Sequence, residues 1–237
     1  MPPTKGGGFV EGDKDEYRYY CMNLVRNRYA VINFSYRLAP EYPFPACVSD
    51  LEKVMHWADK HSAEYGLDTA HVFALGDSAG GHILALYAAL ITGPNDDGLY
   101  INHPKNVSLR ALGLNSAELQ IPEVKKLSTA QRHMFSDLMG QELSEQLLDK
   151  VRLEHRITKD FPAVYMIAGN KDPLCARIPA FCRLLSEKGV EHRCKIYGTE
   201  ESPLGHVFFL DIRKKNSEEA TNDELNYFME MYSQKNI

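Results

Sequence analysis

Short apolar runs alternate with longer amphipathic stretches along this chain. The runs are rich in β-branched residues and have the length of strands, whereas the stretches between them have helical periodicity. The predicted strands are Tyr29–Tyr36, His71–Leu75, Leu109–Leu114, Ala163–Ala168 and His192–Tyr197. The predicted helices are Asp13–Asn27, Ala46–Glu64, Ala79–Ile91, Ile178–Lys188 and Glu218–Tyr232. This alternation predicts an α/β fold, in which helices flank both faces of a mostly parallel sheet.

One long segment, Pro122–Glu154, is helical in composition but polar. We expect it to leave the sheet and cross over it as a lid. No repeat, low-complexity segment or linker interrupts the chain. The sequence therefore predicts a single domain over residues 1–237.

The composition is that of a soluble globular protein. Hydrophobic residues make up 44% and charged residues 25% of the 237 residues, which is enough for one sizeable core. A net charge of −5 gives no basic surface for nucleic acid, and no apolar run approaches the ~20 residues of a membrane span. The first residues lack the apolar part of a secretion signal, and the cysteine count, 5, is odd. We expect a cytoplasmic protein with reduced thiols and no structural zinc site.

A candidate nucleophile lies between the second predicted strand and the helix after it. The motif Gly76–Gly81 reads GDSAGG, which matches G-x-S-x-G in the strand–turn–helix context that this pattern requires. Small residues at Gly76 and Gly80 allow a sharp turn that lifts the Ser78 hydroxyl above the sheet edge. The amide of Ala79, at the start of the helix, is placed to stabilise an oxyanion.

A serine nucleophile needs a base and an acid. In the fold that carries this motif, the chain order is serine, then aspartate or glutamate, then histidine. Asp172 and His206 lie in the loops after the last two predicted strands, so they share the sheet edge of Ser78. The other histidines well beyond Ser78 are His103, His133, His155 and His192. Glu200 and Glu201 are the alternative acids. The sequence predicts a Ser78–His206–Asp172 triad.

These motifs resemble the hormone-sensitive-lipase-like branch of the α/β-hydrolases, close to bacterial carboxylesterases and acetyl esterases. The resemblance rests on GDSAGG, on the loop Tyr36–Ala46, and on the segments Asp172–Leu174 and Gly205–Phe208. It implies an α/β-hydrolase fold and serine-dependent hydrolysis of carboxylic esters, with no metal or organic cofactor.

The glycine-rich start of the chain, Lys5–Phe9, corresponds to the oxyanion loop of that family, which normally reads His-Gly-Gly-Gly. The resemblance places the amides of Gly6 and Gly7, with that of Ala79, around the oxyanion. Lys5 stands where the family has histidine.

In that family a hydrophobic strand precedes this loop and further strands precede that one. Met1–Thr4 is too short to supply them, so we expect the N-terminal strands to be missing. The gap would lie between the predicted strands Tyr29–Tyr36 and His71–Leu75. The sequence leaves three explanations open. The neighbouring strands could close up, another chain could donate a strand, or the protein could be a shortened form.

The expected activity is hydrolysis of short-chain acyl esters, with acetyl esters among them, through an acyl-enzyme. The expected partner is a small-molecule ester, and a homo-oligomer is compatible with the sequence. Two alternatives stay open: a non-catalytic homologue that binds a small molecule, and a peptidase or acyltransferase on the same fold.

Overall fold

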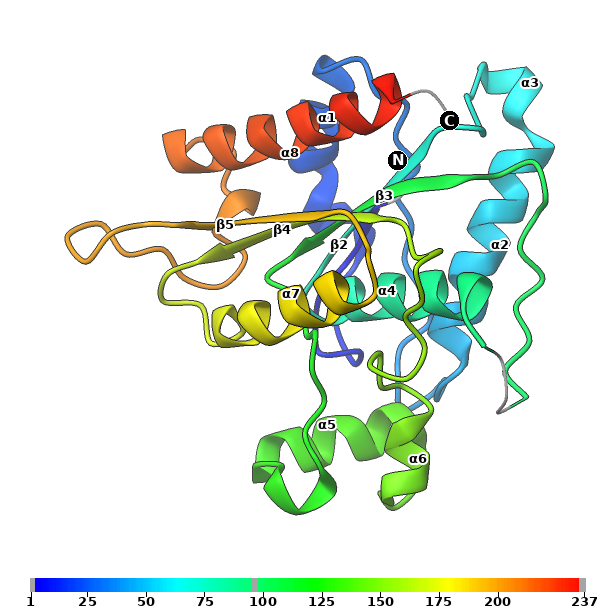
Figure 1. Ribbon diagram of the computed structural model, residues 1–237, viewed down its shortest axis with the longest axis vertical. Coiled ribbons are helices and arrows are strands. Elements are labelled where there is room, and N and C mark those ends of the chain that lie inside the picture. Colours follow the sequence, from blue (N-terminus) through cyan, green and yellow to red (C-terminus); the bar gives the residue numbers. More distant parts are fainter. Residues whose placement is uncertain (1–2, 95–97, 235–237) are drawn as a thin grey trace.

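A parallel sheet of five strands forms the centre of the computed structural model, which describes residues 3–94 and 98–234 (Figure 1). The strands follow one another across the sheet in the order of the sequence. They are β1 (Pro3–Thr4), β2 (Val72–Asp77), β3 (Leu109–Asn115), β4 (Ala163–Gly169) and β5 (His192–Tyr197). The predicted α/β-hydrolase class, with a parallel sheet flanked by helices, is confirmed.

Helices cover both faces of the sheet. Those with one turn or more are α1 (Arg18–Arg26), α2 (Ala46–Lys60), α3 (Ser62–Tyr65), α4 (Ser78–Thr92), α5 (Thr129–Met139), α6 (Glu145–Asp149), α7 (Ile178–Glu187) and α8 (Lys215–Ser233). Short 3₁₀ turns are η1 (Lys14–Tyr17), η2 (Val124–Lys126), η3 (Cys175–Arg177) and η4 (Phe208–Leu210). One core cluster lies between the sheet and α1 with α8, and the other between the sheet and α2, α4 and α7.

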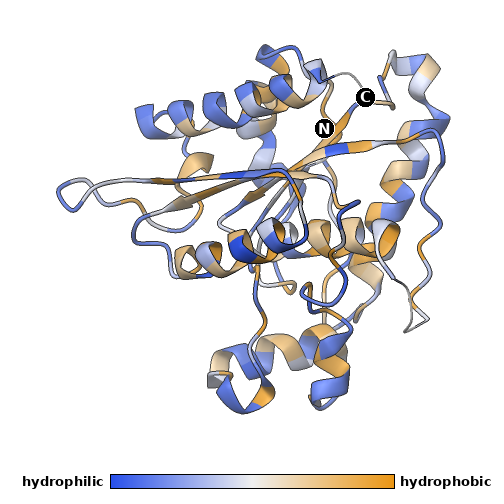
Figure 2. Cartoon of the chain, in the orientation of Figure 1, coloured by the Kyte–Doolittle hydropathy of each residue, from blue (hydrophilic) through white to orange (hydrophobic). Residues whose placement is uncertain are grey.

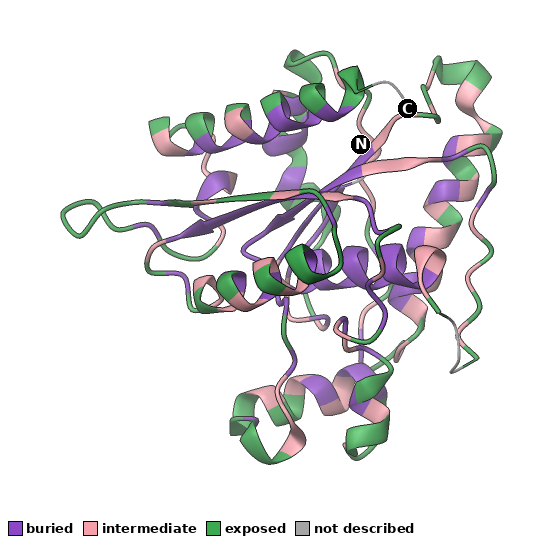
Figure 3. Cartoon of the chain, viewed as in Figure 1, coloured by how far each residue is buried: buried purple, intermediate pink, exposed green. Residues whose placement is uncertain are grey.

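Helix α4, which follows the candidate nucleophile, is buried along nearly its whole length (Figure 3). It packs against β2, β3 and α2, so apolar side chains are needed on all its sides rather than on one stripe. Its hydropathy agrees with this position (Figure 2). The helix therefore holds its own N-terminus rigidly against the sheet.

The predicted strand Tyr29–Tyr36 is present only as an extended segment. It meets the described part of β1 through a parallel bridge between Phe34 and Thr4, and Tyr36 is the one buried residue of residues 29–36. The prediction of a regular buried strand was wrong because the described neighbour, β1, offers only two residues for pairing.

A strand of two residues does lie before the glycine loop, where the sequence predicted none. Pro3 pairs with Leu75 and Thr4 pairs with Gly76, so β1 lies between β2 and the extended segment at Phe34. The neighbouring strands do not close up at this point. Met1 and Pro2, which belong to the same expectation, lie outside the described residues.

The segment predicted as a lid contains η2, α5 and α6, which lie away from the sheet at the bottom of Figure 1. Its inner side chains still join the main core, because Phe135 and Leu138 are buried there. Phe135 packs on Phe9, with 6.2 Å between the ring centres, directly after the glycine loop. The segment thus covers the loop where the oxyanion site is expected.

In the described ranges, no helix is both long and apolar enough to cross a membrane.

Candidate active site

Ser78 lies at the sharp junction of β2 and α4, where the sequence placed it. Its φ of 49° is in the left-handed region that non-glycine residues rarely adopt. A Cβ on Gly76 would come within 2.7 Å of the Gly80 carbonyl oxygen, and one on Gly80 would overlap the carbonyl oxygens of Thr4 and Lys5. Both glycines are therefore required by the close approach of backbone around the serine.

The amide of Ala79 is in the first turn of α4, where N–H groups have no partner within the helix. No side chain caps this helix, because the Asp77 carboxylate is turned away from it. The Ala79 N–H and the positive end of the helix dipole are thus available to an anion beside Ser78.

The glycine loop meets the serine turn directly. A Cβ built on Gly6 would lie 3.1 Å from the Ser78 Cβ and 2.6 Å from Asp77 Oδ2. The two-residue strand β1 leads the chain to this point. The first residues of the chain are therefore part of the candidate site.

The Gly6 N–H, which was expected to donate to the oxyanion, has another partner. Its N–H donates to the Tyr17 hydroxyl at 3.0 Å, and its carbonyl accepts from the Tyr36 hydroxyl at 3.3 Å. Among the described residues, the N–H groups of Gly7 and Gly8 have no such partner. Gly6 holds the loop in place, and the next two amides are the ones left free.

Lys5 supports the loop in the position where histidine is usual. It is buried, its Nζ donates to the Glu11 carbonyl at 2.7 Å, and it lies 4.2 Å from the centre of the Tyr36 ring. Burial lowers its pKa, while the carboxylates of Glu16 and Asp13 act in the opposite direction. A cation–π contact with Tyr36 and a hydrogen bond to Glu11 therefore hold the start of the loop in place.

Asp77, next to the serine, is a buried carboxyl that contacts the loop. It accepts a hydrogen bond from the Tyr17 hydroxyl at 2.9 Å. Burial raises its pKa to about 7, against the hydrogen bond from Tyr17 and the charge of His206. Tyr17 thus links the peptide of Gly6 to the residue before the nucleophile.

The predicted base and acid lie together. His206 Nδ1 is 3.1 Å from each carboxylate oxygen of Asp172. The hydrogen bond to Asp172 raises the pKa of His206, and the charges of Asp172 and Asp77 act in the same direction, against burial. Burial alone would raise the pKa of Asp172, but hydrogen bonds from His206, Ser116 and the Leu174 N–H hold it below its usual value. The pair is that of an imidazole oriented by a carboxylate.

Ser116 is a residue of this site that the sequence analysis missed. It follows β3 with a φ of 48°, and the Val207 N–H, next to the base, donates to its Oγ at 3.3 Å. It is also a hydrogen-bond partner of Asp172. Its place directly after a central strand is the signal that could have found it.

A family model for the alpha/beta hydrolase fold matches residues 4–210 of this chain. The chain belongs to this alpha/beta hydrolase family. Esterase LipI of Mycobacterium tuberculosis is 28% identical over 224 residues, which cover 92% of this chain and 68% of LipI. Lipase 2 of a Moraxella species is 37% identical over 92 residues, which are only 21% of that protein. The expected resemblance to the lipase-like carboxylesterase branch is confirmed.

Solved structures of esterases are also similar to this chain. Esterase B of Lactobacillus rhamnosis superimposes with a TM-score of 0.88 at 25% identity, over 99% of this chain and 78% of the esterase. The same esterase inhibited by a tributyrin phosphonate gives a TM-score of 0.86 over 97% of this chain and 74% of that one. The prediction of a carboxylesterase-like hydrolase agrees with these relatives.

Two further titratable side chains have structural partners in this hydrolase. His82 is buried, with Nδ1 2.8 Å from the Glu118 carbonyl and its ring edge on Phe9. Glu200 is exposed and pairs with Lys171 at 2.9 Å. His82 is therefore a packed core residue, and Glu200 faces solvent rather than the base.

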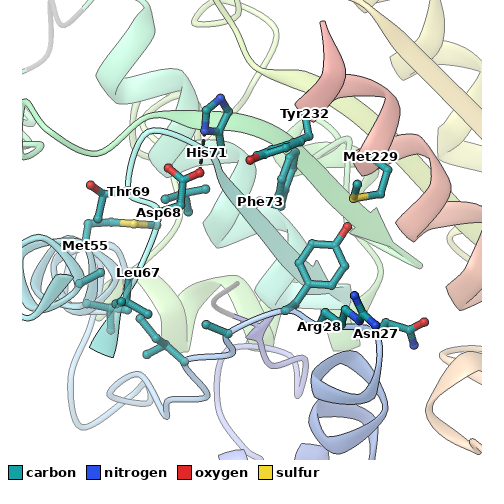
Figure 4. Close-up of a pocket in the computed structure, with 17 residues that line it drawn as sticks. Asn27, Arg28, Met55, Leu67, Asp68, Thr69, His71, Phe73, Met229 and Tyr232 are labelled. Atoms are coloured by element: carbon teal, nitrogen blue, oxygen red, sulfur yellow. Dashed lines mark hydrogen bonds and ion pairs between the residues drawn. The ribbon is translucent and has the colours of Figure 1, made fainter. Parts of the chain in front are cut away.

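The large cavity of the described structure lies elsewhere. It has a volume of about 460 Å³ and a mostly apolar lining from residues 27–32, residues 66–71, α2, α8 and the first half of β2, including Met55, Phe73 and Met229 (Figure 4). Ser78 is at the opposite end of β2. The cavity is next to the part of β2 that the described residues of β1 do not reach, so it belongs to the short sheet edge rather than to the site.

No group of three or more histidine, cysteine or acidic side chains is placed to hold a metal ion in the ranges that the structure describes.

Proposed function

We propose that this protein hydrolyses carboxylic esters of short acyl chains through a Ser78–His206–Asp172 triad. The observation that carries the proposal is the His206–Asp172 contact at 3.1 Å, together with the strained turn at Ser78. Asp77, beside the serine, raises the pKa of His206 after the larger effect of Asp172, so the base and the serine turn are electrostatically close.

The hydrogen bond between Asp172 and Nδ1 decides the direction of proton transfer. It keeps the proton on Nδ1 and leaves Nε2 of His206 as the basic nitrogen. Ser78 Oγ attacks the ester carbonyl carbon while its proton passes to Nε2. The imidazolium that forms is stabilised by the Asp172 carboxylate.

The tetrahedral oxyanion is held by backbone amides. We assign this role to the N–H groups of Ala79, Gly7 and Gly8, because the N–H of Gly6 is already bonded to Tyr17. His206 then gives its proton to the leaving alcohol, and the carbon–oxygen ester bond breaks. Water, deprotonated by His206, attacks the acyl-serine and releases the acid.

Short acyl chains are proposed from the relatives. Esterase B of Lactobacillus rhamnosis accepts a tributyrin phosphonate as inhibitor, which supports acyl groups of this size as substrates here. Acetyl esters belong to the same class and have a shorter acyl chain than butyryl esters.

The test compares p-nitrophenyl acetate with p-nitrophenyl butyrate turnover in wild type, Ser78→Ala and an exposed control, Ser233→Ala. We expect Ser78→Ala to lose at least about 10³-fold in kcat, because the proposed acyl-enzyme forms on the hydroxyl that this change removes. The control should equal wild type. Equal turnover by Ser78→Ala would remove the serine from the mechanism.

A fluorophosphonate probe separates catalysis from simple binding. An activated Ser78 forms a covalent adduct, whereas a non-catalytic homologue stays unlabelled. Comparison of matched ester and anilide substrates addresses the peptidase alternative, since an esterase turns over the ester much faster. Faster anilide turnover would favour the peptidase.

A further inference from the structure

Two thiols lie side by side at the edge of the molecule, outside the candidate active site. Cys182 is on α7 and Cys194 is on β5, and their sulfur atoms are 3.7 Å apart. Cys194 is exposed, and Cys182 is partly exposed. Both sulfurs can therefore be approached from solvent.

The pair has the requirements of a reversible disulfide. α7 packs on β5, so two rigid elements already hold the sulfurs together. A disulfide bond of about 2.05 Å needs a further approach of only about 2 Å. The two residues are 12 positions apart in the chain, so the bond would close a short loop.

We propose that Cys182 and Cys194 form a thiol–disulfide exchange site for low-molecular-weight disulfides such as oxidised glutathione. The exposed Cys194 thiolate attacks one sulfur of the glutathione disulfide and releases one glutathione thiol. Cys182 then loses its proton and attacks the Cys194 sulfur, which releases the second glutathione thiol. Two protein thiols are oxidised and one glutathione disulfide is reduced.

The order of attack follows from the surroundings of the two thiols. Burial and the neighbouring thiol raise the pKa of Cys182 to about 12, so it is rarely a thiolate in the reduced protein. Cys194 is the more exposed sulfur and meets the reagent first. Cys182 becomes reactive only against the adjacent mixed disulfide.

The cross-link would join α7, which follows the acid Asp172, to β5, which precedes the base His206. Since the sulfurs are already neighbours, the bond should stabilise this packing without moving the Asp172–His206 pair. We expect oxidation to raise the midpoint of thermal unfolding by about 5 °C, with unchanged ester turnover.

The experiment incubates the folded protein in glutathione redox buffers and maps the cysteines by tryptic digestion under acid quench. The three candidate cysteines fall into separate peptides, Asp172–Arg177, Ile178–Arg183 and Cys194–Lys195. We expect the last two peptides to be linked, with a mass about 2 Da below their sum. Dithiothreitol should reverse both the link and the thermal shift.

Matched variants complete the test. Cys182→Ser and Cys194→Ser should each abolish the thermal shift, whereas Cys175→Ser should keep it. A glutathione adduct on Cys194 that never resolves, a link from Cys194 to Cys175, or no oxidation in buffers that oxidise a reference dithiol would each overturn the proposal. A link between the right cysteines with a lower unfolding midpoint would overturn its stabilising role.

Discussion

The backbone N–H and carbonyl of Gly6 are both hydrogen-bonded, so the position of this residue depends on two tyrosines. Tyr17 accepts from its N–H, and Tyr36 donates to its carbonyl. Tyr17 also donates to Asp77, so one hydroxyl joins the loop to the nucleophile turn. A hydroxyl that both accepts and donates can do this, whereas a carboxylate only accepts and an ammonium group only donates.

Removal of that hydroxyl should loosen the oxyanion loop. We expect Tyr17→Phe to lower kcat for p-nitrophenyl acetate by roughly tenfold, less than the full loss of an oxyanion donor, with little change in KM. Tyr19→Phe is the matched control, because Tyr19 is on the same connection with 66% of its surface exposed. A change in KM alone, or equal losses in both variants, would contradict a positioning role for Tyr17.

The pH dependence of turnover should report the two carboxyls that act on His206. The base must be neutral to accept the serine proton, and its pKa is raised by Asp172 and, less, by Asp77. Activity should therefore fall with decreasing pH at a higher pH than an ordinary histidine predicts. Asp77→Asn removes one negative neighbour, so the acidic limb of kcat/KM should move to lower pH.

The measurement is the profile of kcat/KM between about pH 5 and 9 for wild type and Asp77→Asn. Asp68→Asn is the control, since that exposed carboxylate pairs with His71, far from the site. An acidic limb that stays in place in Asp77→Asn, or moves to higher pH, would rule out the assigned electrostatic link.

The turn between β2 and α4 depends on the absence of side chains. Gly80→Ala would force a methyl group against the Thr4 and Lys5 carbonyl oxygens, which are backbone atoms of β1 and the loop after it. We expect a loss of about 3 kcal/mol in the free energy of unfolding, measured by urea denaturation. Gly205→Ala is the matched control, because a Cβ there meets nothing within 4 Å. Equal stability of the two variants would show that β1 does not pack against the turn.

Elements with a strong period or a strong motif could be predicted from the sequence. Helix α4 and the strand before it were found because an apolar run, GDSAGG and a second apolar run follow one another. The positions of Asp172 and His206 followed from strand ends, and the structure brings these two residues together at 3.1 Å. Such features are local, so one sequence carries them.

Features that depend on contacts between distant segments could not be predicted. β1 has two residues and no period of its own; only its pairing with Leu75 and Gly76 makes it a strand. The bond from Gly6 to Tyr17 similarly depends on how η1 folds back over the loop. The family resemblance predicted that the Gly6 N–H donates to the oxyanion. A motif could not show that this N–H is already bonded to Tyr17.

The sheet as a whole is unevenly supported from one side to the other. β2, β3 and β4 each have described partners on both sides, and helices cover both their faces. Beyond β1, residues 31–34 meet the described part of the sheet through the bridge from Phe34 to Thr4. Stability against local opening should therefore decrease from the centre of the sheet towards this edge.

Amide hydrogen exchange followed by mass spectrometry measures this gradient directly. We expect peptides from β3 and β4 to exchange only by global unfolding, since their amides are buried and paired on both sides. Peptides covering residues 31–34 should exchange at least about 100-fold faster, because the described ladder contact there is the one bridge at Phe34. β5, the opposite edge, is the internal control: it has one neighbour but a full ladder of six pairs with β4. Protection of residues 31–34 as strong as that of β5 would contradict this gradient, because it would require pairing along the whole length of this edge.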